Sequence, residues 1–414
     1  MIPKPPFPND VTLEDEVSQF ELLKPRLHEV WESILMKEEE PHTSVVVPSL
    51  TLDQTELRKL PGVNYYEERL LFLLIRLRNP HARMVYVTSE PVHPMILEYY
   101  FQFLAGIPAS HARQRLTLLC AHDGSPRSLT QKILERPRLV ERIRAGIQDP
   151  ARAYLTVFNS TPFERKLAVL LGIPLNGVDP KLSHLGTKSG SRKVFREAKV
   201  ELPMGSEDLR TEHEVENALV ELREARPGLR RAVVKLNDSF SGEGNALVRF
   251  PEGQRRADFQ ASLKEMEFSV PSETPAIYFD KFARMGGIVE EYIEAQEKAS
   301  PSAQMRISPK GEVVLISTHD QILGGISGQM FLGCSFPAQD DYRGLLPEDL
   351  IEILTYNKLH YNHATESGVL FHLIGALSEF GKLGLTAIAN SREEVDELYL
   401  RTLNILDNET AYGR

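Results

Sequence analysis

The sequence predicts a chain of mixed α/β and α+β class, in which an open α/β domain comes first. Three observations predict it: β-branched runs alternate with helices from Val45 to about Pro180, a glycine-rich loop follows Lys235, and a second turn lies at residues 308–311. Because 414 residues are too many for one ordinary core, we expect two or three domains. The expected domains are residues 1–180, 181–287 and 288–414.

The first 180 residues contain short apolar runs that predict strands and Leu-, Phe-, Tyr- and Ile-rich stretches that predict helices packed on the sheet. The expected strands are residues 45–47, 84–88, 116–119 and 154–158, and two expected helices are residues 67–77 and 95–105. Thr161, Pro162 and Glu164 form a capping box with proline at the first helical position, and the helix that they begin should end at Gly172. A turn-rich segment, residues 173–180, follows as the end of the first domain.

The second part of the chain is predicted to contain two hairpins. A helix at residues 188–198 precedes an apolar strand that ends at Lys235, and a strand at residues 246–250 returns after the loop. Residues 303–307 and 312–317 flank the Ser-Pro-Lys-Gly turn and should form the second hairpin. Another capping box at residues 391–394 predicts a helix near the end of the sequence.

Composition narrows the classes of partner and the compartment. The net charge of -10, with 58 acidic against 48 basic residues, argues against a nucleic-acid partner. The arginines Arg223, Arg226, Arg230 and Arg231 are interpreted as a solvated helix end. Cys120 and Cys334 are too few for a disulfide framework or a thiolate metal site, which predicts a reducing, cytoplasmic location. The proline-rich start does not resemble a secretory signal, and no apolar stretch is long enough to span a bilayer, so no membrane partner is expected. A homodimer through the N-terminal domain is one expected assembly.

Lys235 is the residue with the clearest chemical indication. It ends an apolar strand and is followed by the small, polar residues 239–245, whose backbone amides at Gly242 and Gly244 can close around an anion. This pattern indicates a nucleotide triphosphate, with ATP as the first ligand to test. A surface lysine beside an ordinary hairpin is the alternative, and for Lys188 taken alone it is the preferred one. Residues 186–189 do not form a Walker A motif, because glycine does not directly precede Lys188.

Other catalytic motifs are absent from the sequence. It contains no G-x-G-x-x-G after a strand, no H-E-x-x-H and no G-x-S-x-G elbow, so dehydrogenase, zincin and α/β-hydrolase readings lack support. His360 and His363 have metal-like spacing, but two histidines at a helix end explain them better.

Several stretches in order resemble the ATP-grasp superfamily, and more closely its peptide ligases of the pheganomycin-biosynthesis type, which carry a preceding α/β (pre-ATP-grasp) domain. The matching stretches are residues 171–177, 185–192, 234–245, 288–293, 317–325 and 371–378. In that superfamily two α+β lobes clamp ATP. The resemblance implies a ligase that uses ATP and Mg²⁺ to join a small carboxylic acid to an amine, such as an amino acid or peptide, through an acyl phosphate.

The resemblance also implies a role for each matching residue. Lys188 and Lys235 would hold phosphates under a loop that includes Ser241, Gly242 and Gly244. A strand edge from Glu290 to Ile293 would face the purine, with Gly286 and Gly287 permitting lobe movement and Glu297 accepting from the ribose. Arg306, with Lys235, would stabilise the anionic transition state, and His319 and Asp320, after the partner strand, would meet substrate on the same rim. The purine-facing residues are Glu290, Glu291, Tyr292 and Ile293. A buried strand with a charged edge, and an ion pair between Arg306 and Asp320, are the alternatives.

The sequence departs from this family in its second lobe. Relatives hold Mg²⁺ with a late Glu-x-Asn motif, but none occurs between Asp320 and Arg414, and the match at residues 243–245 lies in the glycine-rich loop. A block of strands is therefore expected to be missing near Asp340, which makes the second lobe truncated, as in a splice form, a gene-model gap or a deleted pseudo-enzyme. Three hypotheses stay open: an active ligase, a catalytically impaired regulatory or scaffold module that binds nucleotide, and a structural assembly with a plain turn at the glycines.

Overall fold

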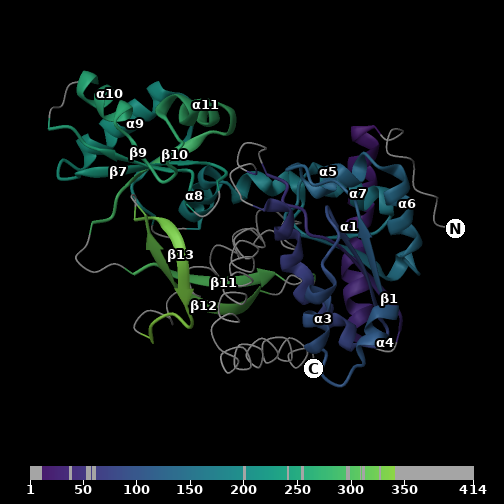
Figure 1. Cartoon of the computed structure of the whole chain (residues 1–414). Helices are drawn as coiled ribbons and strands as arrows, with labels where there is room; N and C mark the ends of the chain where they lie inside the picture. Colours follow the sequence, from purple (N-terminus) through teal and green to yellow (C-terminus); the bar gives the residue numbers. More distant parts are fainter. Residues whose placement is uncertain are drawn as a thin grey trace. The chain divides into compact units, whose positions relative to one another are not determined.

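The structure is a computed structural model that describes most of the first 340 residues (Figure 1). The described residues are 12–36, 40–52, 57, 62–198, 202–239, 242–252, 256–294, 299–307, 309, 313–325 and 328–340. They belong to two compact units, which we call the N-terminal unit (Met1–Ser183 with Arg306–Glu312) and the second unit (His184–Met305 with Val313–His363). Three features of the sequence lie outside the described residues. They are the capping box at residues 391–394 with the helix that it predicts, the pair His360 and His363, and residues 371–378.

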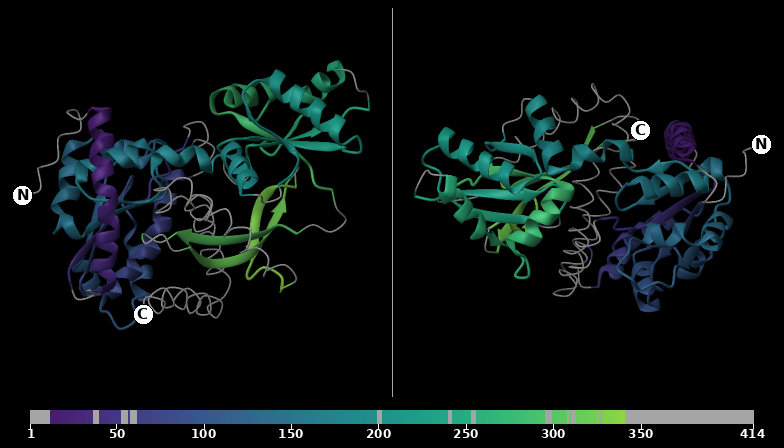
Figure 2. Two further views of the ribbon diagram at one scale, coloured as in Figure 1. Left: turned by 180° about the vertical axis from the view of Figure 1, so that it is seen from behind. Right: turned by 90° about the horizontal axis from the view of Figure 1, so that it is seen from above.

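The N-terminal unit is built on a five-stranded parallel sheet (Figure 2). Its strands, in the order β3-β2-β1-β4-β5, are β1 His42–Val47, β2 Ala82–Thr88, β3 Leu116–Cys120, β4 Ala153–Val157 and β5 Leu175–Asn176. Val45 pairs with Val85 on one side and Leu155 on the other, and all three are fully buried or nearly so. The four predicted strands are confirmed, because β-branched runs covered on both faces form parallel sheets.

Helices cover both faces of this sheet. They are α1 Leu13–Met36, η1 Val63–Arg78, α3 Pro94–Gln102, α4 Ala109–Gln114, α5 Leu129–Leu134, α6 Pro137–Ala145, η2 Pro150–Arg152, α7 Pro162–Leu171 and η3 Pro180–Gly186. Residues of α1, α5, α6 and α7 share one core with Val45 and Val85. On the other face the hydroxyl of Tyr86 donates to the backbone of η1, which is wound as a 3₁₀ helix. The capping box before α7 is confirmed, and Gly172 ends α7 in the left-handed conformation.

The second unit contains a five-stranded antiparallel sheet. Its strands, in the order β6-β10-β7-β8-β9, are β6 Gly205–Leu209, β7 Arg231–Leu236, β8 Asn245–Arg249, β9 Glu267–Phe268 and β10 Gly287–Glu291. The accompanying helices are α8 Lys188–Glu197, α9 Glu212–Ala225, α10 Arg256–Lys264 and α11 Pro275–Met285. Residues of α9, α10 and α11 pack on the sheet in one core. The predicted hairpin is confirmed, since β7 and β8 are antiparallel neighbours and Lys235 pairs with Asn245.

A separate three-stranded sheet follows, with β11 Pro301–Ile307, β12 Val313–Gly324 and β13 Met330–Ser335 in that order. The expected pairing of β11 with β12 is present. The expected end of β12 was wrong, because the strand continues to Gly324 through pairing with β13, so His319 and Asp320 lie within it. One parallel and two antiparallel sheets make the fold the predicted α/β and α+β combination. Among the described residues, no helix is long and apolar enough to cross a membrane.

Candidate functional site

Lys188 and Lys235 are brought together by Asn237, which directly follows β7. The backbone amide of Lys188 donates to the Asn237 carbonyl at 3.3 Å, and the amide of Ser189 donates to Asn237 Oδ1 at 3.0 Å. Thr187 caps α8 by accepting from the amide of Gly190 at 3.0 Å. The first turn of α8 is therefore hydrogen-bonded to Asn237, two residues after Lys235 at the end of β7.

Gly190 is required for this close approach. A Cβ added at Gly190 would lie 1.9 Å from the carbonyl oxygen of His184 and 2.8 Å from Cα of Leu185. Those neighbours are backbone atoms and have little freedom to move. The backbone immediately before α8 can thus fold against its first turn only because residue 190 has no side chain.

Lys235 donates to a buried carboxylate, Glu290 on β10. Its Nζ lies 2.6 Å from Glu290 Oε2, and Arg192 Nη1 lies 2.5 Å from Glu290 Oε1. Arg192 also donates to Glu207 at 3.1 Å. Burial alone would raise the pKa of Glu290, but the charges and hydrogen bonds of Lys235 and Arg192 outweigh it and hold that pKa below its ordinary value. Glu290 is thus ionised and fixed between two cations.

Lys188 is the cation that this carboxylate does not pair with. Its half-buried ammonium donates to Ser239 Oγ at 3.3 Å, and no ion pair joins it to a carboxylate of the described residues. Burial, followed by the charge of Lys235, lowers the pKa of Lys188 to about 8. Three cations, Lys188, Arg192 and Lys235, therefore lie near Glu290. A second carboxylate, Glu207, pairs with Arg192. The arrangement can accept an anion at Lys188.

The glycine-rich loop is held at its C-terminal end. The carbonyl of Gly242 accepts from the amide of Asn245 at 3.1 Å, and the carbonyl of Gly244 accepts from Leu236 at 3.1 Å and from the hydroxyl of Tyr278 at 3.0 Å. Gly242 has a φ of 83°, a conformation that favours glycine. Ser241 lies outside the described residues.

The same loop reaches the connection between β12 and β13. Asn245 Nδ2 donates to Gln329 Oε1 at 3.1 Å, and a Cβ at Gly242 would lie 2.4 Å from the Gln329 carbonyl oxygen. A Cβ at Gly328, in turn, would lie 3.1 Å from the hydroxyl of Tyr292. The tip of the β12–β13 hairpin thus lies against both the glycine-rich loop and the end of β10.

The predicted purine-facing residues lie at the end of β10. The backbone amides of Glu291 and Tyr292 donate to the carbonyls of Met204 and Arg231, at 2.8 and 3.2 Å. The Arg231 guanidinium stacks on the Tyr292 ring, 4.2 Å from its centroid, whereas Ile293 is 64% exposed. Ile293 thus presents exposed apolar surface just after the end of β10. Glu297 lies outside the described residues.

The prediction that Gly286 and Gly287 permit lobe movement stays a prediction. A Cβ at Gly287 would lie 2.3 Å from the Lys235 carbonyl and 2.3 Å from the Phe282 ring, so close packing there also favours glycine. The predicted solvated helix end is confirmed in part, because Arg226 caps the C-terminus of α9 and the side chains of Arg226 and Arg230 are 54% and 79% exposed. Arg226 also pairs with Glu291 at 2.7 Å, and Arg231 pairs with Glu294 at 2.9 Å.

His319 and Asp320 are not brought to one rim. They are neighbours on β12, so their side chains leave opposite faces of the sheet. The His319 ring is 4% exposed and lies against Phe336, with 4.9 Å between the ring centroids. Within the described part of the chain, its buried Nδ1 has no hydrogen-bond partner. Burial lowers the pKa of His319, with the charge of Asp320 opposing the shift. Asp320 Oδ2 accepts from the amide of Gln339 at 2.9 Å. Arg306 lies on β11, and its role stays a prediction.

Sequence reasoning missed Arg192, Asn237 and Glu207. Arg192 lies four residues after Lys188 on α8, and this spacing places both on one face of the helix. That spacing was the available signal. Among the described residues, no group of three His, Cys, Asp or Glu side chains comes together to hold a metal ion.

Two family models match parts of the chain, and two known proteins are similar to it. Residues 180–252 match a family model described as IQCH-like, ATP-grasp, and residues 349–402 match one described as PGM1 C-terminal domain. The chain is 32% identical over 308 residues to L-propargylglycine–L-glutamate ligase of Streptantibioticus cattleyicolor, covering 73% of the chain and 62% of the ligase. It is 26% identical over 361 residues to IQ motif-containing protein H of Danio rerio, covering 76% of the chain and 34% of that protein.

A solved structure with a similar fold is the biotin carboxylase–β,γ-ATP complex from Campylobacter jejuni. It has a TM-score of 0.50 and 15% identity, with 77% of this chain and 59% of that chain covered. The chain thus spans less than two thirds of the length of each of these relatives. The matched segment at residues 180–252 contains both Lys188 and Lys235. This segment, the ligase relative and the fold together support the ATP-grasp superfamily for this chain.

Proposed function

We propose that the protein is an ATP-dependent carboxylate–amine ligase that forms an acyl phosphate from a carboxylic acid and lets an amine displace the phosphate. The observation that carries this proposal is the cationic site around Lys188, which lacks a carboxylate partner among the described residues while Lys235 and Arg192 share Glu290. A triphosphate supplies the negative charge that such a site favours. No enzyme nucleophile is needed for this chemistry.

Each residue of the site has a distinct role in the proposal. Lys188 binds a phosphate oxygen, and Lys235 contributes a second positive charge whose position Glu290 holds. Arg192 keeps Glu290 ionised and in place, and Asn237 fixes the distance between α8 and β7. The glycine-rich loop lies over the phosphates, and Ile293 contacts the base. Arg306 stabilises the oxygens of the acyl phosphate.

Amino acids are the proposed substrate class. The relative from Streptantibioticus cattleyicolor is named for joining two amino acids, and it aligns with 73% of this chain. Magnesium belongs to the proposal through the fold family alone. The described residues provide no cluster of metal ligands, and the sequence from Asp320 to Arg414 has no Glu-x-Asn. The described residues therefore do not account for Mg²⁺ binding.

The second candidate is an ATP-grasp module that binds nucleotide without turnover and acts as a regulator or scaffold. The missing Glu-x-Asn motif favours it, because phosphoryl transfer needs charge stabilisation at the β- and γ-phosphates. In this candidate the Lys188 site still binds nucleotide, but no phosphoryl transfer follows.

Release of ADP separates the two candidates. Purified protein is incubated with ATP, Mg²⁺ and pairs of amino acids, and ADP and phosphate are measured. The ligase predicts ADP release that depends on both amino acids and is lost in Lys188→Ala. Lys193→Ala is the matched control, because Lys193 is an exposed lysine of the same helix that pairs with Asp208. Nucleotide binding without ADP release in any pair favours the second candidate.

A further inference from the structure

A second cluster of buried polar groups lies in the N-terminal unit, at the carboxyl ends of the parallel strands. Ser89 directly follows β2, Glu67 comes from η1, and Lys132 comes from α5. Their exposed fractions are 0%, 4% and 0%. Ligands of open parallel sheets bind beyond the carboxyl ends of the strands, and burial of unexplained ionisable groups there is typical of a binding site.

The three groups form a short hydrogen-bonded chain. The Ser89 hydroxyl donates to Glu67 Oε1 at 2.6 Å and accepts from Lys132 Nζ at 2.8 Å, and the Ser89 amide donates to Glu67 Oε2. Each carboxylate oxygen of Glu67 keeps one further lone pair for another donor. Burial raises the pKa of Glu67 to about 7, against the hydrogen bonds from Ser89. A cation bound beside Glu67 would therefore stabilise its ionised form, which burial disfavours.

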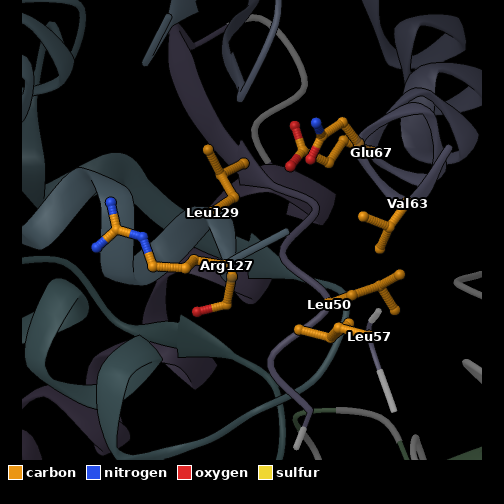
Figure 3. Close-up of a pocket in the computed structure, with 8 residues that line it drawn as sticks. Leu50, Leu57, Val63, Glu67, Arg127 and Leu129 are labelled. Carbon is orange, nitrogen blue, oxygen red and sulfur yellow. The ribbon is translucent and has the colours of Figure 1, made fainter. Parts of the chain in front are cut away.

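A small pocket opens beside Glu67 (Figure 3). Its polar lining comes from Asn64, Glu67 and Ser128, and its apolar lining includes Leu50, Val63 and Leu129. Its cavity volume is about 10 Å³, which is close to the roughly 10–15 Å³ that one water-sized group requires. The pocket therefore suits one small group rather than a nucleotide.

Ser128 shows that the pocket has unused hydrogen-bonding capacity. It is 7% exposed and lines the pocket, and its buried Oγ has no hydrogen-bond partner among the residues that the structure describes. A buried hydroxyl in this state costs free energy unless something binds it. Both ends of the Asn64 amide are already used, because Nδ2 donates to the Gly124 carbonyl at 2.9 Å and Oδ1 accepts from Lys132 Nζ at 3.5 Å. The polar groups left to a ligand are thus the Glu67 carboxylate and the Ser128 hydroxyl.

The carboxylates in the network around the pocket outnumber the cations by one. Arg127 also lines it, but its guanidinium extends away from Glu67, Val63 and Leu50 (Figure 3) and pairs with Glu135 at 2.8 Å and Asp123 at 3.0 Å. Asp123 is shared with Arg136 at 2.8 Å. The carboxylates in this network are Glu67, Glu90, Asp123 and Glu135, and the cations are Arg127, Lys132 and Arg136.

We propose that this pocket binds the primary ammonium group of a small amine or amino acid, with Glu67 and Ser128 as its acceptors. The apolar wall of Leu50, Val63 and Leu129 contacts the carbon next to the ammonium group. An amine substrate of the proposed ligase is a ligand of this class. That identification rests on the proposed function, whereas binding at the pocket does not.

Calorimetry of the full chain with three matched probes tests the chemical class. L-alanine carries an ammonium and a carboxylate group, ethylamine carries only the ammonium group, and propionate carries only the carboxylate. We expect binding of L-alanine and ethylamine and no binding of propionate. Absence of ethylamine binding, or binding of propionate, overturns the proposal. A non-hydrolysable ATP analogue is titrated in parallel, and its failure to bind counts against the proposed function alone.

Two variants test the location. Glu67→Gln should weaken ethylamine binding about tenfold or more, and Ser128→Ala should weaken it severalfold, as expected for lost hydrogen bonds to a charged group. Glu164→Gln is the control, because Glu164 is a fully buried carboxyl group that accepts from Thr51 at 2.6 Å and does not line the pocket. Unchanged affinity in Ser128→Ala, or an equal loss in Glu164→Gln, overturns the location. Ser128→Ala decides the matter if Glu67→Gln does not fold.

Discussion

Lys235 Nζ lies 2.6 Å from Glu290 Oε2, and this contact joins two neighbouring strands, β7 and β10. Because Arg192 binds the other oxygen of Glu290, the carboxylate has a cation on each side. Lys188 is left with a hydroxyl partner instead of a carboxylate among the described residues. The site thus separates a lysine whose charge is neutralised locally from one whose charge is available to a ligand.

Glu290→Gln should destabilise the second unit by about 2 kcal/mol or more, because it leaves two buried or half-buried cations without their carboxylate. Urea unfolding measures the change as a shift of the midpoint, with the denaturant slope m the same in both proteins. Glu267→Gln is the control, since its pair with Arg249 is exposed and should contribute no more than about 1 kcal/mol. Equal midpoints for the two variants would show that Glu290 does not stabilise the site.

The stability contributed by Glu290 should also depend on pH in one direction. Its folded-state pKa lies below the ordinary value of 4.5, so the contribution is present above pH 4.5 and is lost as the pH falls through the folded-state pKa. The difference in free energy of unfolding between wild type and Glu290→Gln should therefore shrink on acidification. A difference that grows below pH 4.5 would contradict the assigned ionisation.

Nucleotide affinity should fall as the pH rises through about 8. Burial and the charge of Lys235 lower the pKa of Lys188 to about 8, so its ammonium loses its proton above that pH and no longer attracts a phosphate. Titration of a non-hydrolysable ATP analogue between pH 7 and 9.5 measures the effect. Lys188→Arg keeps its charge throughout this range and should give a flatter profile. Parallel profiles for the two proteins would exclude Lys188 as the titrating group.

Gly190→Ala should weaken nucleotide binding and destabilise the second unit by about 1–3 kcal/mol, because the added methyl group would meet the His184 carbonyl at 1.9 Å. Gly228→Ala is the matched control, since a Cβ there meets nothing within 4 Å. Thermal unfolding and analogue binding are compared for both variants. If Gly190→Ala behaves like Gly228→Ala, the packing before α8 does not position Lys188.

Asn237→Ala should separate α8 from the end of β7. It removes the acceptor of the Ser189 amide and the donor to the Met285 carbonyl, each at 3.0 Å, at a cost of about 1–3 kcal/mol. Hydrogen exchange at the Ser189 amide should accelerate, and analogue affinity should fall. Unchanged exchange at Ser189 would mean that Asn237 does not hold the helix.

The sequence predicted those parts of the fold that depend on local patterns. The capping box at Thr161 and Glu164 and the β7–β8 hairpin each depend on residues close together in the chain, so both could be read directly. The end of β12 was missed because pairing with β13 extends it. The pair of Arg192 and Glu290 joins residues 98 positions apart, and the cluster of Glu67, Ser89 and Lys132 comes from three elements, so neither has a local signal. The resemblance located Lys188, Lys235 and Glu290, whereas the position of Glu290 between the cations, in place of a purine-facing one, came only from the structure.

Calorimetric titration of the full chain with a non-hydrolysable ATP analogue tests the central claim most directly. We predict saturable binding for the wild type and for Lys193→Ala, and a loss of about tenfold or more for Lys188→Ala and for Lys235→Ala. Identical binding heats for all four proteins would contradict a nucleotide site at these two lysines.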